Sequence, residues 1–136
     1  MSSIKFPCEV YHVNEDIRKK CRNYKIEELG KKYYKKKKYN VIDLHTNKLA
    51  ANENLKTHKS ILKQLITEKG GFFDLLVFKN KKDIFKKNDR WFFAEVKCFH
   101  DKLSKNQIDW LKKNKNFLKN NIKILYIFPK EWVQEF

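Results

Sequence analysis

Two acidic residues stand inside apolar stretches of this sequence, and a lysine follows the second acid. Asp74 lies within 72–78, and Glu95 and Lys97 lie within 91–98. A carboxylate in an apolar strand is costly to bury unless a cation or good hydrogen-bond donors meet it. Strand alternation puts Glu95 and Lys97 on one face. If the two strands pair, Asp74 and Glu95 converge on one point with Lys97 beside them.

Two carboxylates and a lysine suit metal-assisted cleavage of a phosphodiester bond. The carboxylates hold a hard divalent cation through oxygen, and the cation polarises the phosphate and acidifies a water. The lysine orients that water or stabilises charge developing on the phosphate. The alternative is a buried ion pair of Lys97 with Asp74 or Glu95 that only joins two strands. One acid in each of two apolar strands favours the metal site.

The elements around these residues predict one α/β domain of 136 residues in which helices pack on a small mixed sheet. A capping box of Ser104 and Gln107 marks the start of the last helix. The first 13 residues are predicted to form an N-terminal arm. The predicted helices are 14–37, 52–69 and one opening at Ser104, and the predicted strands are 39–44, 72–78, 91–98 and 122–128, in the order αβαββαβ.

Three segments together resemble a known family. They are GFFDLLVF at 71–78, FAEVK at 93–97 and DKLSKNQIDW at 101–110. In content and order they resemble the virus-type replication-repair nucleases (VRR-NUC) of the PD-(D/E)xK superfamily, which have a restriction-endonuclease-like core. The resemblance runs from about Glu27 to Phe128. The family usually has proline before its aspartate, where this chain has Phe73.

The resemblance implies a metal centre and an activity. Asp74 and Glu95 would bind Mg²⁺ or Mn²⁺ together with the backbone carbonyl of Val96, and Lys97 would be the catalytic lysine. The implied enzyme is a metal-dependent endodeoxyribonuclease acting on branched DNA or Holliday junctions in repair, recombination or replication. Two alternatives stay open: a catalytically inactive nucleic-acid-binding protein with the same fold, and a restriction-type nuclease acting on plain duplex DNA.

Two further residues match the family's pattern. Gln107 corresponds to a helix glutamine near the site. Its alternative role is only to complete the capping box with Ser104, and we expect the two roles to need different side-chain directions. The family also has a glutamate on its first helix. We prefer Glu27 to Glu28, because Glu27 lies on the face expected to meet the sheet and Glu28 is flanked by lysines.

The charge of the chain indicates a polyanionic partner. There are 32 Lys plus Arg against 16 Asp plus Glu, a formal net charge of +16. Such an excess repels itself in a compact state and favours DNA as the partner, although a genome rich in lysine codons would also raise it. Aromatic residues such as Trp110, Tyr33 and Tyr34 are expected in the core. The residues predicted to contact DNA are Lys35, Lys36, Lys37, Lys38, Lys102, Ser104 and Lys105.

The three cysteines, Cys8, Cys21 and Cys98, are odd in number and form no CxxC pair. They argue against a disulfide framework and for a reducing, intracellular setting, in the cytoplasm or nucleus of a host. No signal peptide or membrane segment is recognisable, so the protein is not expected to be secreted or to bind a membrane. Short members of the family tend to be homodimers, and we expect the same here, with Trp132 and Phe136 at the interface.

Overall fold

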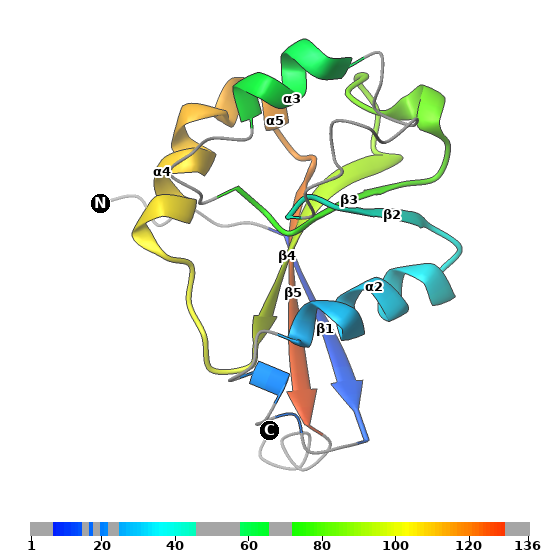
Figure 1. Cartoon of the computed structure of the whole chain (residues 1–136), viewed down its shortest axis with the longest axis vertical. Helices are drawn as coiled ribbons and strands as arrows, with labels where there is room; N and C mark the ends of the chain where they lie inside the picture. The colour runs from blue at the N-terminus through cyan, green and yellow to red at the C-terminus, as the bar shows by residue number, and fades with distance from the viewer. Residues whose placement is uncertain are drawn as a thin grey trace.

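The computed structural model describes residues 7–14, 17, 20–21, 25–45, 58–65 and 72–129. These residues form a mixed α/β fold, as predicted (Figure 1). The elements are β1 (Cys8–Val13), α2 (Ile26–Lys36), β2 (Asn40–Asp43), α3 (Lys59–Leu65), β3 (Leu75–Phe78), the 3-10 turn η3 (Lys81–Asp83), β4 (Trp91–Cys98), α4 (Lys105–Lys113), α5 (Lys115–Leu118) and β5 (Ile122–Pro129).

The five strands form one sheet in the order β1-β5-β4-β3-β2. β1 and β4 both run parallel to β5, whereas β3 is antiparallel to β4 and to β2. Leu75 is paired with Ala94, so Asp74 and Glu95 fall opposite each other just beyond the last pair. The central strand β4 therefore has neighbours of both directions, and the two acids meet where β3 begins.

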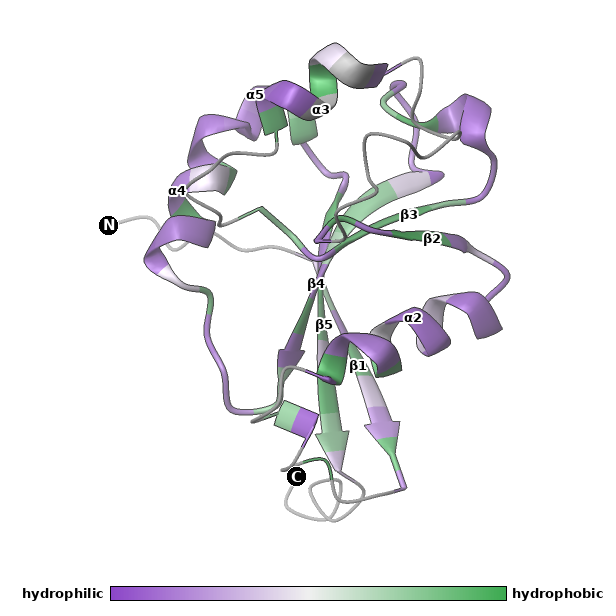
Figure 2. Ribbon diagram, viewed as in Figure 1, coloured by the Kyte–Doolittle hydropathy of each residue, from purple (hydrophilic) through white to green (hydrophobic). Residues whose placement is uncertain are grey.

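Helices cover both faces of this sheet (Figure 1). α2 lies on one face, where Leu29 and Tyr34 pack with residues of β3, β4 and β5. α3, α4 and α5 lie on the other, where Leu65, Trp110 and Leu118 join a second core cluster. The strands are mostly apolar and the outer faces of the helices hydrophilic (Figure 2). The core positions expected for Trp110 and Tyr34 are confirmed, and Tyr33 is partly buried.

The predicted N-terminal arm is wrong over 8–13, because those residues form β1 at the edge of the sheet. Their burial alternates weakly, and Val10 is 47% exposed, so the segment lacks the apolar run typical of a buried strand. Pairing along β5, which is remote in sequence, supplies its backbone hydrogen bonds. A local pattern cannot reveal such a strand.

The single helix predicted over 14–37 is also wrong. α2 begins only at Ile26, after Lys25 in a non-helical cap conformation. The Lys25 N–H donates to the Lys20 carbonyl, five residues back, which closes a wider turn than an α-helix allows. Both ends of the second predicted helix, 52–69, lie outside the described residues, as do Trp132 and Phe136.

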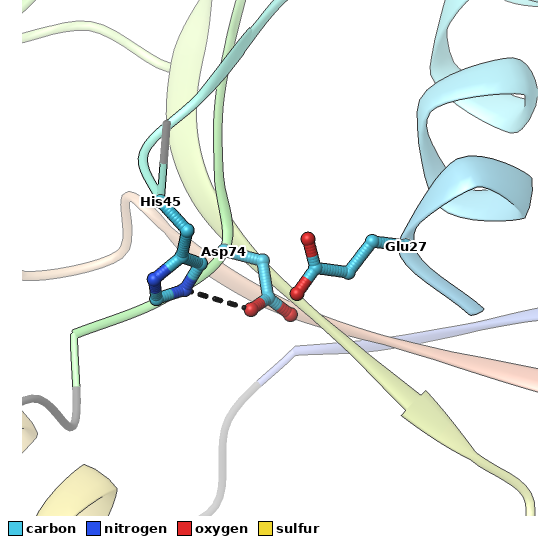
Figure 3. A group of neighbouring side chains, drawn as sticks. All are labelled: Glu27, His45 and Asp74. Carbon is cyan, nitrogen blue, oxygen red and sulfur yellow. Dashed lines mark ion pairs between the residues drawn. The ribbon is translucent and has the colours of Figure 1, made fainter. Parts of the chain in front are cut away.

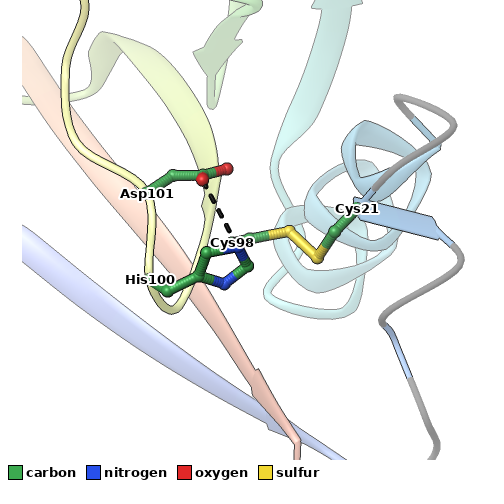
Figure 4. Close-up of a disulfide and its surroundings, with 4 residues drawn as sticks. All are labelled: Cys21, Cys98, His100 and Asp101. Carbon is green, nitrogen blue, oxygen red and sulfur yellow. Dashed lines mark ion pairs between the residues drawn. A yellow bond between two sulfur atoms is a disulfide. The ribbon is translucent and has the colours of Figure 1, made fainter.

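Cys21 and Cys98 form a disulfide, which corrects the expectation of a disulfide-free chain (Figure 4). The two cysteines are 77 residues apart, and β4 and the segment before α2 bring them together. The third cysteine, Cys8, is exposed. Beside the disulfide, His100 and Asp101 form an exposed ion pair at 3.6 Å. None of the helices in the described part of the chain is long and apolar enough to cross a bilayer.

Candidate active site

Asp74 is the centre of a buried polar group on the sheet. It directly precedes β3, and its carbonyl accepts a hydrogen bond from the Leu44 N–H at 2.8 Å, which fixes the backbone beside the end of β2. Only 7% of Asp74 and 4% of Glu95 are exposed. Both acids predicted from the sequence are thus held in the interior, where an unpartnered charge would be costly.

Three elements supply partners to the Asp74 carboxyl group. Oδ1 lies 3.0 Å from Nε2 of His45, and Oδ2 accepts from the Val96 N–H at 3.0 Å. The carboxyl group of Glu27 is hydrogen-bonded to Asp74 as well. Figure 3 shows Glu27 reaching from the start of α2 and His45 from the end of β2 toward the same carboxylate.

Glu95 lies on the other side of Asp74 and is held by three donors. Its Oε1 accepts from the Asp74 N–H at 3.2 Å, and its Oε2 accepts from Nε2 of Gln107 at 2.6 Å. Nζ of Lys97 lies 3.5 Å from the same Oε2. The predicted convergence of Asp74, Glu95 and Lys97 is therefore present, with Glu95 and Lys97 on one face of β4 as expected.

The close approach of the carboxyl groups of Glu27, Asp74 and Glu95 changes their pKa values. Burial, together with the charge on Asp74, raises the pKa of Glu27 to about 8 and that of Glu95 to about 9. Burial alone would also raise the pKa of Asp74, but hydrogen bonds from His45, Glu27 and the Val96 N–H outweigh it and hold that pKa below its usual value. The hydrogen bond to Asp74 raises the pKa of His45. In the absence of a cation, protons on Glu27 and Glu95 relieve the repulsion between the three carboxyl groups.

Gln107 performs both of the roles that its sequence position suggested. Its Oε1 accepts from the Ser104 N–H at 2.9 Å and the Ser104 Oγ accepts from the Gln107 N–H, which completes the capping box of α4. Its Nε2 meanwhile donates to Glu95. The expectation that capping and site contact need different side-chain directions is wrong, because the two ends of one amide group serve them separately.

Close packing of α2 on β4 determines which glutamate of that helix enters the site. A Cβ at Gly30 would collide with the γ-methyl groups of Val96, so only glycine lets the helix approach this closely. Glu27 lies almost one turn before Gly30 and contacts Asp74, whereas Glu28 is exposed. The preference for Glu27 over Glu28 agrees with this geometry.

The structure adds His45, which was absent from the residues chosen from the sequence. Its backbone N–H donates to Oδ1 of Asp43 at 2.9 Å, and its ring stacks on Phe72 at 4.8 Å between centroids. Lys31 of α2 pairs with Asp43 and holds the end of β2 against that helix. The only available signal in the sequence was a histidine directly after a predicted strand, which is common without any function.

The predicted DNA-contacting residues occupy two places. Lys35, Lys36, Lys37 and Lys38 are exposed at the far end of α2, 8 to 11 residues beyond Glu27, roughly 12–16 Å along a helix axis. Lys37 there pairs with Glu9 at 3.3 Å and lies over the ring of Tyr33. Lys102, Ser104 and Lys105 are exposed where α4 begins, two to five residues before Gln107 in the chain. Contact with nucleic acid stays a prediction for all seven.

The donor set fits a divalent cation. One ligand atom each from Glu27, His45 and Asp74 lies within 4.8 Å of the others, in the described part of the chain. Carboxylate oxygens suit Mg²⁺ and Mn²⁺, and an added imidazole nitrogen favours Mn²⁺ over Mg²⁺. Glu95 is not in this group, and metal binding by Glu95 and by the Val96 carbonyl stays a prediction. Comparison with protein-family models, curated proteins and solved structures found no match to this chain.

Proposed function

We propose that this protein is a metal-dependent endodeoxyribonuclease that hydrolyses phosphodiester bonds of branched DNA. One observation carries the proposal: four segments remote in sequence bring Asp74, Glu95, Lys97, Glu27 and Gln107 into one connected group. A surplus of buried carboxyl groups beside a lysine is poorly explained as a structural ion pair, because a single acid would satisfy Lys97. The additional carboxyl groups fit a site that binds a cation, with the ammonium group of Lys97 as a nearby proton donor.

Different residues of the site would bind the cation and act on the substrate. Asp74, Glu27 and His45 would hold the cation, with Glu95 and the Val96 carbonyl as further ligands toward Lys97. A Mg²⁺ or Mn²⁺ ion there would polarise the scissile phosphate and lower the pKa of a water. Lys97, whose side chain is 15% exposed, is placed to hydrogen-bond that water or the phosphate oxygen on which charge develops.

The remaining contacts position the carboxylates of Glu95 and Asp74. Gln107 keeps Oε2 of Glu95 aligned between α4 and β4, and the Val96 N–H orients the Asp74 carboxylate. A site supported by hydrogen bonds from several elements loses little freedom when substrate binds, which favours catalysis. The phosphate backbone would be bound by the excess of lysines, including Lys35–Lys38, Lys102 and Lys105, together with Ser104.

The order of elements supports a restriction-endonuclease-like core of the VRR-NUC type, with both acids on the central antiparallel pair β3–β4. Within this proposal the protein acts on DNA in repair, recombination or replication, and the Cys21–Cys98 disulfide removes the cysteine-based argument for a reducing, intracellular setting. The protein forms a homodimer, because two symmetric cuts at a four-way junction need two sites.

A cleavage assay with defined substrates tests the proposal. Duplex, flap and four-way-junction DNA are incubated with the protein and Mg²⁺, Mn²⁺ or EDTA, and the cuts are mapped. We expect metal-dependent cutting that prefers branched DNA and is lost by more than 100-fold in Asp74→Asn, Glu95→Gln and Lys97→Ala. Asp109→Asn is the matched control, because Asp109 is an exposed acid of α4 and is not part of this connected group. Equal cutting by wild type and Asp74→Asn would refute the nuclease.

A further inference from the structure

A hollow of about 700 Å³ lies at the opposite end of the β3–β4 pair from the acidic group. Its walls come from the start of β4 and β5, the η3–β4 loop and the chain around α5. Trp91, which opens β4, lines it, and Glu95 is four residues farther along the same strand. At the rise of a β-strand this separation is roughly 13 Å.

Both aromatic rings and lysines line this hollow. Phe85, Trp91 and Phe117 form a cluster with ring centroids 5.3 to 6.3 Å apart. Phe117 is 38% exposed, one of two large apolar side chains exposed among the described residues. Four lysines line the hollow against one acid, Asp89. An exposed aromatic side chain surrounded by lysines is complementary to a ligand that carries both planar rings and negatively charged groups.

Two residues that line the hollow have an unusual backbone conformation. Phe85 has φ +64° and Lys119 has φ +47°, and both residues line the hollow. Left-handed backbone at a non-glycine residue costs of order 1 kcal/mol or more, so the surrounding contacts must hold it. In Phe85 this conformation turns the ring onto Trp91 and Phe117. The three packed rings thus form one side of the hollow.

We propose that this hollow binds an unpaired DNA strand, with a base stacked on Phe117 and phosphates beside Lys87 and Lys119. A duplex does not fit this chemistry, because its base faces are hidden in the stack. The choice of DNA as the ligand of this hollow rests on the proposed function. A strand whose cleaved phosphate lies at Asp74 would reach the hollow within about four nucleotides at 3.4 Å each. The hollow would therefore recognise the single-stranded arm of a branch next to the cut.

Binding measured without metal tests this site separately from catalysis. Fluorescein-labelled oligothymidine and a duplex of equal length are titrated in EDTA, with anisotropy as the readout. Phe117→Leu keeps an apolar side chain but loses the ring, and we expect a loss of affinity for oligothymidine of about fivefold to 100-fold with little change for the duplex. Phe117→Trp should retain affinity and show quenched fluorescence of the new indole when the oligonucleotide binds. Val10→Ala, at the other exposed apolar side chain, is the control.

A second pair of variants tests the phosphate contact. Lys87→Gln should reduce the slope of log affinity against log salt by about 0.7 for the single strand, whereas Lys32→Gln, an exposed lysine of α2, should leave it unchanged. Unaltered oligothymidine binding in Phe117→Leu would overturn the proposal, as would an equal loss for single strand and duplex. Competition by polyglutamate that depends on Phe117 would also overturn it, in favour of an acidic protein partner. If the protein does not cut DNA but shows the expected binding changes in these variants, the nuclease proposal fails and the single-strand binding site remains.

Discussion

Gln107 donates from Nε2 to Oε2 of Glu95 across 2.6 Å, and the oxygen of the same amide accepts from the Ser104 N–H. Both residues are buried, at 8% and 4% exposure. A single side chain therefore joins the first turn of α4 to the central strand. The start of the helix and the position of the carboxylate are fixed together.

Two substitutions should separate capping from the site contact. Gln107→Glu keeps the capping oxygen but places a second carboxyl group beside Glu95, so we expect cleavage to fall by at least tenfold with a small change in stability. Ser104→Ala removes the capping hydroxyl, which is also a predicted DNA contact, and should cost about 1 kcal/mol of unfolding free energy with a smaller loss of cleavage than Gln107→Glu. Urea denaturation and single-turnover cleavage measure the two effects. Equal loss of cleavage in both variants would contradict the division of roles.

The packing of Gly30 on Val96 predicts a steric effect on the metal centre. Gly30→Ala would press a methyl group into Val96, whose N–H orients Asp74, and would push back the helix that carries Glu27. We expect a cost of about 1–3 kcal/mol in stability and weaker Mn²⁺ binding. Adding Val96→Ala removes the obstructing methyl groups and should restore metal affinity, measured by calorimetry. No recovery in the double variant would mean that the contact does not position the site.

Metal binding should release protons, because Glu27 and Glu95 are protonated at neutral pH when no cation is present. With pKa values raised to about 8 and about 9, both must ionise to act as ligands. We expect Mn²⁺ affinity to rise with pH up to about 9, and the two glutamates together to release about two protons per ion at pH 7, in addition to the protons lost by His45. Calorimetry in buffers of different ionisation enthalpy counts them. Glu27→Gln should release about one proton fewer, and a pH-independent affinity would exclude these groups as ligands.

The same pKa shifts predict how the stability of the metal-free protein depends on pH. A carboxyl group whose pKa is higher in the folded than in the unfolded state binds more protons when folded, so its contribution is complete below about pH 4.5 and is lost as pH rises through the folded value. Stability should therefore fall between about pH 4.5 and 9. Glu27→Gln should flatten this slope in thermal melts, and saturating Mn²⁺ should offset it.

The Cys21–Cys98 disulfide should contribute to stability through the long loop that it closes. A bridge over 77 residues restricts the unfolded chain, and its loss should cost about 2–4 kcal/mol. Thermal melts with and without a reductant, together with Cys21→Ser, measure the effect. Because Cys98 follows Lys97 and Cys21 precedes α2, reduction should also weaken metal binding. Cys8→Ser is the control and should respond to reductant like the wild type.

Several parts of the site could be predicted from single positions. Asp74 and Glu95 are conspicuous because each interrupts an apolar strand, and the strand period places Lys97 beside Glu95. Burial of a carboxylate is so costly that its presence in such a strand already implies partners. Helical periodicity likewise distinguished Glu27 from Glu28, because only one face of α2 meets the sheet.

What the sequence determined by itself is the mixed α/β class and the convergence of Asp74, Glu95 and Lys97. The first follows from the periodicity of the elements, and the second from one acid in each of two apolar strands. Only the tertiary structure decided that β1 pairs with β5, that Cys21 reaches Cys98 and that His45 meets Asp74. It also decided that Gln107 serves helix and site together. Each of these depends on how separate elements approach in space. The strand partners are 116 positions apart, the cysteines 77, His45 and Asp74 29, and Gln107 and Glu95 12 positions in different elements, and no local pattern records such an approach.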